Sequence, residues 1–222
     1  MAIFGLSVVE LKQAWRLCRK AREGGKHRPP ESTEIRSDTD TGFFIEHLGR
    51  LFVVVDGSDN LAEWVKNLFW IRWGRDKVSA GFLKSAFEFS QQIKELASSS
   101  LPVVCVGHSR GGAIVQKVAI ELSRNGFNVQ SVISFGSPKV GGRRFVRSMK
   151  SSEIFHIRVF SPDDPVPKLP RFRGEHYETM AVTFEKQFDL FDLFPASVAV
   201  KGVIDHLSYG TLLNDKTIWE RA

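Results

Sequence analysis

The stretch from Val103 to Val115 places the tightest constraint on how this 222-residue chain can fold. It begins with the apolar run Val-Val-Cys-Val, passes through Gly-His-Ser-Arg-Gly, and continues into small and apolar residues. A continuous apolar run is typical of a strand buried on both faces of a sheet. Helical spacing follows and stops at Asn125-Gly126, a pair typical of a helix C-terminus. We therefore expect a central strand, a tight turn and a helix that packs back on the strand.

Ser109 stands in the middle of that turn, between Gly107 and Gly111. Small residues are required on both sides, because the serine backbone is strained and the helix lies close to the strand. The serine is then expected to stand exposed at the carboxyl end of the sheet, at the positive end of the helix dipole. The pattern is typical of a nucleophilic serine, but a glycine-rich turn in another α/β fold can share it.

Chain length and composition favour one domain over residues 1–222. Hydrophobic residues make up 42% of the chain and charged residues 25%, which is ordinary for a globular protein. Residues 1–41 are expected to form an N-terminal helix, from Leu6 to Arg22, and a surface loop over 24–41, both packed on this domain.

Segments with strand and helix patterns alternate from about residue 43 onward. Such alternation predicts an α/β fold, with a mostly parallel central sheet and helices on both faces. Besides the strand and helix around Ser109, strands are expected at 43–45, 50–55, 129–135, 154–160 and 176–184, helices at 61–73, 82–96 and 207–213, and a Phe-rich loop or short helix at 188–199.

Lysine and arginine outnumber the acidic residues, which gives a formal net charge of +6. A basic surface is either a solvated face or an attraction for anionic membranes or nucleic acid. No basic motif with interleaved aromatic residues supports nucleic-acid binding, so no nucleic-acid partner is expected. Any membrane contact is expected to be peripheral, because no apolar run approaches membrane-spanning length.

The N-terminal residues do not have the pattern of a signal peptide, because Ala2 to Val9 is short, lacks a basic start and is followed by Glu10. Cys18 lies in the N-terminal helix and Cys105 in the buried strand, and no disulfide between them is expected. The compartment and the oligomeric state are left open, with a soluble, cytoplasmic protein as the default expectation.

Loops downstream of Ser109 hold candidate partners for it. A serine hydroxyl is a poor nucleophile until a base removes its proton, and a carboxylate normally orients that base. With this type of turn the chain order is serine, acid, histidine. Asp163 and Asp164 lie in a loop after a predicted strand and are the candidate acids. His206 is the candidate base, because His156 lies inside a strand pattern and His176 begins the last one.

The negative charge that develops on a substrate oxygen requires two preset hydrogen-bond donors. One is expected to be the backbone N–H of Arg110, the residue after the serine. The other is expected from the loop that follows the strand at 50–55, where Ser58 offers both an N–H and a hydroxyl.

Short motifs occur along the chain on either side of the serine turn. They are Val55–Ser58, Glu63-Trp64, Asn67-Leu68, Gly81-Phe82, Gly107–Ala113, Phe135–Gly141, Asp164–Pro170 and Asp205–Tyr209. In this order they resemble the class 3 lipases, the fungal-type lipases of the α/β-hydrolase superfamily, and the resemblance covers residues 42–210.

The resemblance implies an α/β-hydrolase fold and the hydrolysis of carboxylic esters, in particular acylglycerol or phospholipid esters, through an acyl-enzyme. It selects Asp164 over Asp163, because Asp164 stands two residues before a Val-Pro pair as in the family motif. It implies a triad in which Ser109 is the nucleophile and His206 the base. His176 is then the structural histidine that precedes the last strand.

By the same resemblance, Ser58 and the amide of Arg110 line the oxyanion hole, and no metal or cofactor is required. Aromatic segments at 69–73 and 188–194 are candidates for the wall of an acyl-chain pocket and for contact with a lipid interface. The first of these segments can instead pack on the sheet, and both interpretations stay open. The residues singled out for the pocket are Trp70, Trp73, Phe191 and Phe194.

The chain also departs from the family pattern. Asp56 replaces an arginine before Gly57, Ala80 stands near a usual histidine, and Arg110 replaces a leucine beside the nucleophile. The Arg110 side chain is expected to add a cation near the acyl site. The interval before Gly81 is too short to favour a full mobile lid. The alternative function is a catalytically inactive, lipase-fold binding or signalling module, against which the complete triad counts.

Overall fold

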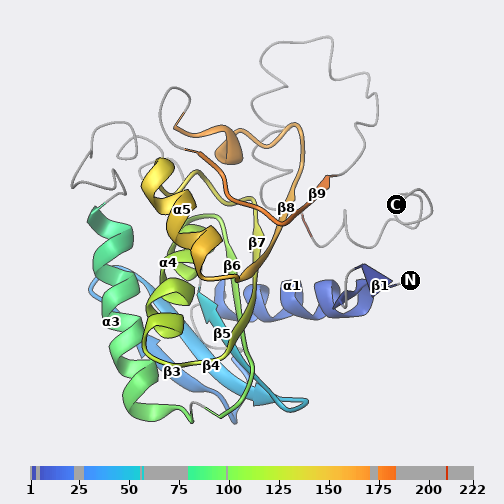
Figure 1. Ribbon diagram of the computed structural model, residues 1–222. Coiled ribbons are helices and arrows are strands. Elements are labelled where there is room, and N and C mark those ends of the chain that lie inside the picture. Colours follow the sequence, from blue (N-terminus) through green and yellow to red (C-terminus); the bar gives the residue numbers. More distant parts are fainter. Residues whose placement is uncertain are drawn as a thin grey trace.

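The computed structural model of the chain, shown in Figure 1, describes residues 2–3, 6–22, 28–55, 57, 80–98, 100–170, 175–183 and 209. The predicted helix at 61–73 and the Phe-rich segment at 188–199 lie outside these residues. The predicted helix at 207–213 also lies outside them, apart from Tyr209.

The strands of the main sheet are β3 (Thr33–Arg36), β4 (Thr41–His47), β5 (Arg50–Val55), β6 (Val103–His108), β7 (Val129–Phe135), β8 (Phe155–Phe160) and β9 (Met180–Thr183). They lie side by side in chain order. β3, β4 and β5 pair antiparallel, whereas β5 to β9 pair parallel. Parallel neighbours need a crossover connection, which explains why helices separate β5 from β6, β6 from β7 and β7 from β8. The predicted mostly parallel sheet is confirmed.

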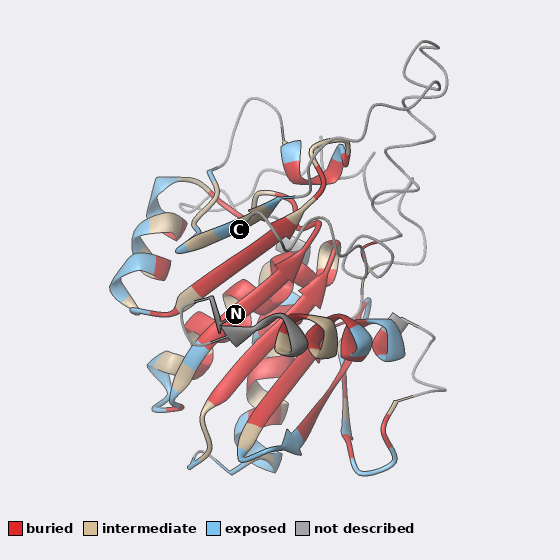
Figure 2. Ribbon diagram, turned by 90° about the vertical axis from the view of Figure 1, so that its right-hand side faces the viewer, coloured by how far each residue is buried: buried red, intermediate tan, exposed pale blue. Residues whose placement is uncertain are grey.

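The helices that flank this sheet are α1 (Val8–Arg22), α3 (Ala80–Leu96), α4 (Arg110–Arg124) and α5 (Arg143–Ser151). α1 packs on one face, against Val54 and Val106, and Figure 2 shows it lying across the buried strands. The other three cover the opposite face, against Val53 and Cys105. Helices on both faces were predicted. In the described ranges, no helix is long and apolar enough to cross a bilayer.

β3 and α5 are elements that the sequence pattern does not predict. β3 lies within the expected loop 24–41, and Ile35 is the one residue of its four that is buried. An alternation this short is not recognisable as a strand before its partner β4 is known. α5 buries Phe145 and Met149 and is otherwise rich in basic residues. A stripe of two apolar side chains gives only a weak helical pattern.

Several predicted boundaries move because of local backbone pairing. α1 begins at Val8 rather than Leu6, since the residues of β2 (Leu6–Ser7) pair with those of β1 (Ala2–Ile3) in a small antiparallel ladder. β9 begins at Met180 rather than His176. The chain before it is held elsewhere, because the Glu175 N–H donates to the Gly141 carbonyl at 2.9 Å.

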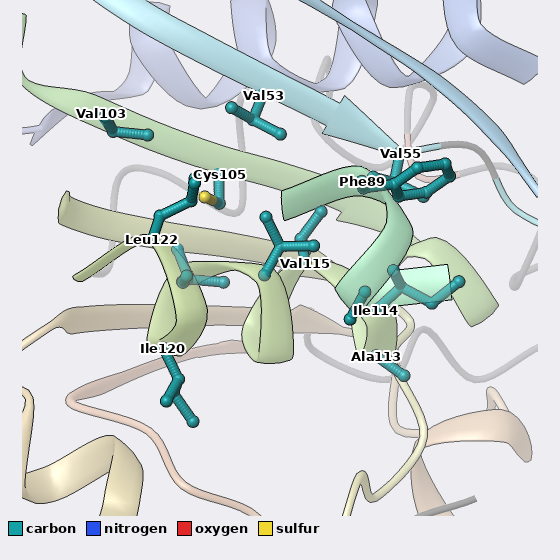
Figure 3. Packing of buried hydrophobic residues seen from close by; sticks show 14 of the residues in the cluster. Val53, Val55, Phe89, Val103, Cys105, Ala113, Ile114, Val115, Ile120 and Leu122 are labelled. Carbon is teal, nitrogen blue, oxygen red and sulfur yellow. The ribbon is translucent and has the colours of Figure 1, made fainter. Parts of the chain in front are cut away.

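Cys18 and Cys105 are buried on opposite faces of the sheet and form no disulfide with each other. Figure 3 shows Cys105 among aliphatic side chains of the sheet and of α4, including Val115 and Leu122. Burial raises the pKa of the Cys105 thiol to about 12. A thiol held in its neutral form by apolar surroundings is a packing group rather than a reactive one.

Candidate active site

The turn after β6 holds Ser109 at a φ of 53° and a ψ of −123°. A non-glycine residue in such a conformation costs about 1–3 kcal/mol and persists only where its surroundings enforce it. Here the Ser109 N–H donates to the Phe135 carbonyl at 2.8 Å, which ties the turn to the end of β7. α4 begins at the next residue, Arg110. This is the strand, turn and helix that the sequence predicts.

Glycines allow the strand and the helix to approach each other at this turn. A Cβ atom on Gly107 would lie 2.5 Å from the carbonyl carbon and oxygen of Gly111. A Cβ atom on Gly112 would lie 2.9 Å from the Cβ of Ser137. Both distances are shorter than a van der Waals contact, so no larger residue fits without a shift of the backbone.

Ser109 is buried, with 2% of the residue exposed, and not exposed as the pattern predicts. The exposure prediction is wrong at this point, and Gly57, which follows β5, lies close to the serine. A Cβ atom on Gly57 would stand only 3.4 Å from the Ser109 Cβ. The Ser109 Oγ makes no hydrogen bond with any residue in the described ranges. A buried hydroxyl in this state is unusual and points to a functional rather than a structural serine.

The two chain segments that carry the predicted oxyanion donors meet at Ser109. Val55 pairs with Gly107 in the parallel ladder between β5 and β6. A Cβ atom on Gly57 would stand 3.1 Å from the carbonyl oxygen of His108, the last residue of β6. Ser58, the predicted donor, follows Gly57 in the chain and lies outside the described residues. Arg110 begins α4, and N–H groups in the first turn of a helix have no acceptor within that helix.

Asp164 lies in the loop after β8 and is completely buried, whereas Asp163 is partly exposed. The Asp164 Oδ1 accepts a hydrogen bond from the Val166 N–H at 2.8 Å, and the Asp164 Oδ2 accepts one from the Tyr209 hydroxyl at 2.6 Å. β8 is two strands from β6 in the sheet, a separation of about 10 Å. The carboxyl ends of these strands lie at one edge, so Ser109 and Asp164 belong to the same end of the molecule.

Tyr209 connects the loop that carries Asp164 to the serine turn, a role that the sequence pattern does not predict. The residue is fully buried, and its ring contacts Trp15, His108 and Phe135 with centroid distances of 5.6, 5.9 and 6.2 Å. Its hydroxyl also accepts the Ser161 N–H at 3.2 Å. The signal was present, since Tyr209 closes the Asp-His-x-x-Tyr motif and the chain has only two tyrosines.

His156 and His176 make hydrogen bonds away from the serine turn. His156 is fully buried in β8; its Nδ1–H donates to the Tyr177 carbonyl, and its Nε2 accepts from the Ser134 hydroxyl at 2.8 Å. Burial lowers its pKa to about 3. His176 donates from Nε2 to the Pro167 carbonyl at 2.7 Å, and burial, with the nearby arginine of β8, lowers its pKa to about 4. Both are structural histidines, and the predicted base, His206, lies outside the described residues.

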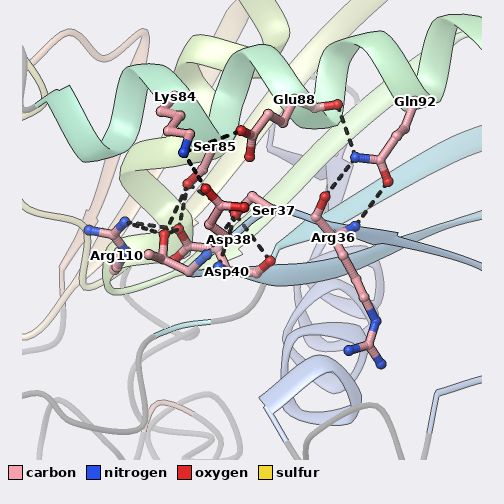
Figure 4. Close-up of polar contacts among 10 residues, drawn as sticks. Arg36, Ser37, Asp38, Asp40, Lys84, Ser85, Glu88, Gln92 and Arg110 are labelled. Atoms are coloured by element: carbon pink, nitrogen blue, oxygen red, sulfur yellow. Dashed lines mark hydrogen bonds and ion pairs between the residues drawn. The ribbon is translucent and has the colours of Figure 1, made fainter.

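The Arg110 side chain is not the free cation near the acyl site that the sequence predicts. Its guanidinium forms an ion pair with Asp40, with 2.6 Å between Nε and Oδ1 (Figure 4). The two charges neutralise each other. A local sequence pattern cannot reveal this ion pair, because Asp40 lies 70 residues earlier in a segment expected to be a surface loop.

The predicted pocket residues Trp70, Trp73, Phe191 and Phe194 lie outside the described residues. In the described ranges, no three His, Cys, Asp or Glu side chains are grouped so that they could hold a metal ion. The described residues bring to this end of the sheet a serine hydroxyl in a strained turn and a buried carboxylate.

A parallel sheet with a strained serine between strand and helix, and an acid after a later strand, defines an α/β-hydrolase. The chain superposes on the Rhizomucor miehei lipase in its propeptide complex with a TM-score of 0.68, covering 92% of this chain and 80% of that one at 20% identity. This likeness confirms the fold.

The sequence comparisons identify the family. Residues 52–174 match the family described as lipase (class 3), so the chain belongs to the class 3 lipases. It is 32% identical over 131 residues to secreted mono- and diacylglycerol lipase 1 of Fusarium solani, covering 54% of this chain and 39% of that protein. It is 26% identical over 152 residues to the chloroplastic phospholipase A1-Ialpha2 of Arabidopsis thaliana, covering 58% and 31%. The chain thus spans less than half the length of these relatives.

Proposed function

We propose that the protein is a serine hydrolase that cleaves carboxylic esters of lipids, either acylglycerols or phospholipids, through an acyl-enzyme. The observation that carries the proposal is the turn after β6, with its strained Ser109 and buried hydroxyl. Strain and a buried hydroxyl without a described partner each cost free energy, so stability does not explain them. Membership of the class 3 lipases supports the same conclusion.

The proposed reaction uses a triad. The Ser109 Oγ attacks the acyl carbon while His206 takes the hydroxyl proton. The oxyanion accepts hydrogen bonds from the Arg110 N–H and from Ser58. Collapse of this intermediate expels the alcohol, which receives the proton from His206, and leaves the acyl group on Ser109. A water molecule, deprotonated by the same histidine, then attacks the acyl carbon; collapse of this second intermediate returns the proton to the Ser109 Oγ and releases the acid. Asp164 orients the histidine and stabilises its cation.

The position of Tyr209 supports His206 as the base. The two residues are three positions apart along the chain, a span of at most about 11 Å. A histidine at this chain distance from Tyr209 can reach the carboxylate that the Tyr209 hydroxyl binds, which supports His206 as the proposed base. A carboxylate oxygen can accept more than one hydrogen bond, so an aspartate that accepts from Val166 and Tyr209 can also orient an imidazole N–H.

Lipid esters are the proposed substrates for two reasons: the relatives are named as lipid hydrolases, and the residues proposed for the pocket are apolar. The Fusarium solani relative is a mono- and diacylglycerol lipase, and the Arabidopsis relative is a phospholipase A1. Large aromatic side chains bury much apolar surface, so Trp70, Trp73, Phe191 and Phe194 are proposed to line the acyl chain and to contact a lipid interface. The net charge of +6 favours an anionic interface.

The test is a chain-length series of p-nitrophenyl esters, with a phospholipid beside it, hydrolysed by the wild type and by Ser109→Ala. We expect the variant to retain less than about one-thousandth of the wild-type kcat, because it lacks the nucleophile. Ser123→Ala, on α4 but away from the turn, is the matched control and should keep full activity. A wild type no more active than Ser109→Ala on any of these substrates would favour the inactive binding module instead.

A further inference from the structure

A bidentate ion pair fixes the side chain of the residue after Ser109. The Arg110 Nε donates to the Asp40 Oδ1 at 2.6 Å, and its Nη2 donates to the Asp40 Oδ2 at 2.8 Å. The side chains are only 11% and 3% exposed. Two parallel charge-assisted bonds define both the position and the orientation of the guanidinium plane.

The Asp40 carboxylate is fully supplied with donors. The Ser85 hydroxyl reaches its Oδ2 at 2.5 Å, and the Thr39 hydroxyl reaches the same oxygen at 2.7 Å. Burial by itself raises the pKa of Asp40, but the bonds and charge of Arg110, with those two hydroxyls, outweigh it and leave the pKa below its ordinary value. Asp40 is therefore charged near neutral pH.

Three elements of the fold meet around the guanidinium, as Figure 4 shows. Two hydrogen bonds close the turn between β3 and β4. The Ser37 N–H donates to the Asp40 carbonyl at 2.8 Å, and the Asp40 N–H donates to the Ser37 hydroxyl at 2.9 Å. α3 contributes Ser85 and also Phe82, whose ring centroid lies 5.2 Å from the Arg110 Cζ. α4 contributes Arg110 itself. The carboxylate is thus held by its own turn and by a helix, independently of the arginine.

Stability alone does not account for this arrangement. The desolvation of two buried charges offsets much of their attraction, so an apolar residue is often as stable in the same place. Leucine, the residue that the family pattern has at position 110, would avoid that cost. What the ion pair adds is a fixed geometry next to a strained turn.

We infer that Asp40 is a positioning residue for catalysis: by holding the Arg110 side chain, it fixes the direction of the Arg110 backbone N–H toward the oxyanion. The inference rests on the function proposed above. The peptide group between Ser109 and Arg110 carries this N–H, and Ser109 has the strained φ of 53°. Strain of this kind relaxes unless the neighbours prevent it, and the anchored side chain restricts rotation of that peptide.

The test measures kcat, KM and thermal unfolding for Asp40→Asn, Arg110→Leu and the double variant, on the p-nitrophenyl ester that the wild type cleaves best. Arg110→Leu retains the amide donor but removes the guanidinium. We expect each single variant to lose on the order of 10- to 100-fold in kcat, less than the loss of an entire oxyanion donor, with KM changed by less than about twofold. The double variant should regain stability, since no buried charge is left unpaired, while its kcat stays low.

A double variant that regains kcat together with stability would overturn the positioning role, and so would an Asp40→Asn variant with wild-type kcat. Asp38→Asn is the matched control, because Asp38 lies in the same turn but pairs with Lys84 at the surface. It should keep the wild-type kcat. A wild type no more active than Ser109→Ala overturns the proposed function, and this role with it, so the two failures are distinguishable.

Discussion

At the scale of single residues, the hydroxyl of Tyr209 helps to hold the buried Asp164 carboxylate in place. The Tyr209 hydroxyl donates to the Asp164 Oδ2 and accepts the Ser161 N–H, so it ties both ends of the turn from Ser161 to Asp164 to a buried ring. Asp164 and Tyr209 are 45 residues apart in the chain. The Asp-His-x-x-Tyr motif marks the tyrosine, but only the folded chain assigns its partner.

Replacement of Tyr209 by Phe should therefore impair catalysis without disturbing the packing of the ring. We expect a fall of about tenfold in kcat and a loss of about 1.5–3 kcal/mol in the free energy of unfolding, because a buried carboxylate loses a donor. Steady-state kinetics and urea unfolding measure the two effects. Tyr177→Phe is the control, since its backbone carbonyl rather than its hydroxyl binds His156. Equal effects of both substitutions would contradict the assignment.

At the scale of elements, the site depends on how closely α4 approaches β6. The pattern of apolar residues and glycines predicted both elements and the turn between them, because each signal is local. It did not predict β3, whose single buried residue becomes meaningful only beside β4. The turn between β3 and β4 carries Asp40, so the partner of Arg110 was missed together with the strand.

Gly107→Ala should separate the two elements. The added methyl group would meet the Gly111 carbonyl at 2.5 Å, and backbone atoms cannot move aside as a flexible side chain does. We expect a loss of about 1–3 kcal/mol in the free energy of unfolding. Gly142→Ala, where an added Cβ has nothing within 4 Å, should change it by less than about 0.5 kcal/mol. Thermal or urea unfolding compares the two, and a similar effect in both would contradict the close approach.

At the scale of the whole molecule, stability in acid should depend on the Asp40–Arg110 pair. Folding lowers the pKa of Asp40 below its ordinary value of 3.8, so the unfolded chain binds the proton more readily. The contribution of the pair is therefore complete above 3.8 and is lost as the pH falls through the lowered pKa. Among the described residues near this turn, Lys84 pairs with Asp38 and with Glu88, and Arg36 pairs with Glu34.

The measurement is the free energy of unfolding of the wild type and of Asp40→Asn as a function of pH. We expect the wild type to be the more stable above about pH 4 and the difference to shrink at lower pH, as linkage requires. Asp38→Asn should show no comparable change, because its carboxylate is exposed. A difference that stays constant across this range would show that the charge of Asp40 does not stabilise the fold.

The sequence by itself determined the central strand, the serine turn, the helix after it, the mostly parallel sheet and the family. These follow from short-range patterns: apolar runs, glycines at a tight turn and motifs of a few residues. The tertiary structure alone decided the burial of Ser109, the approach of Gly57 to it, the bond from Tyr209 to Asp164 and the pairing of Arg110 with Asp40. The reason is that the partners come from distant parts of the chain, and only the packed sheet and helices bring them together. A short-range sequence pattern does not specify such long-range contacts.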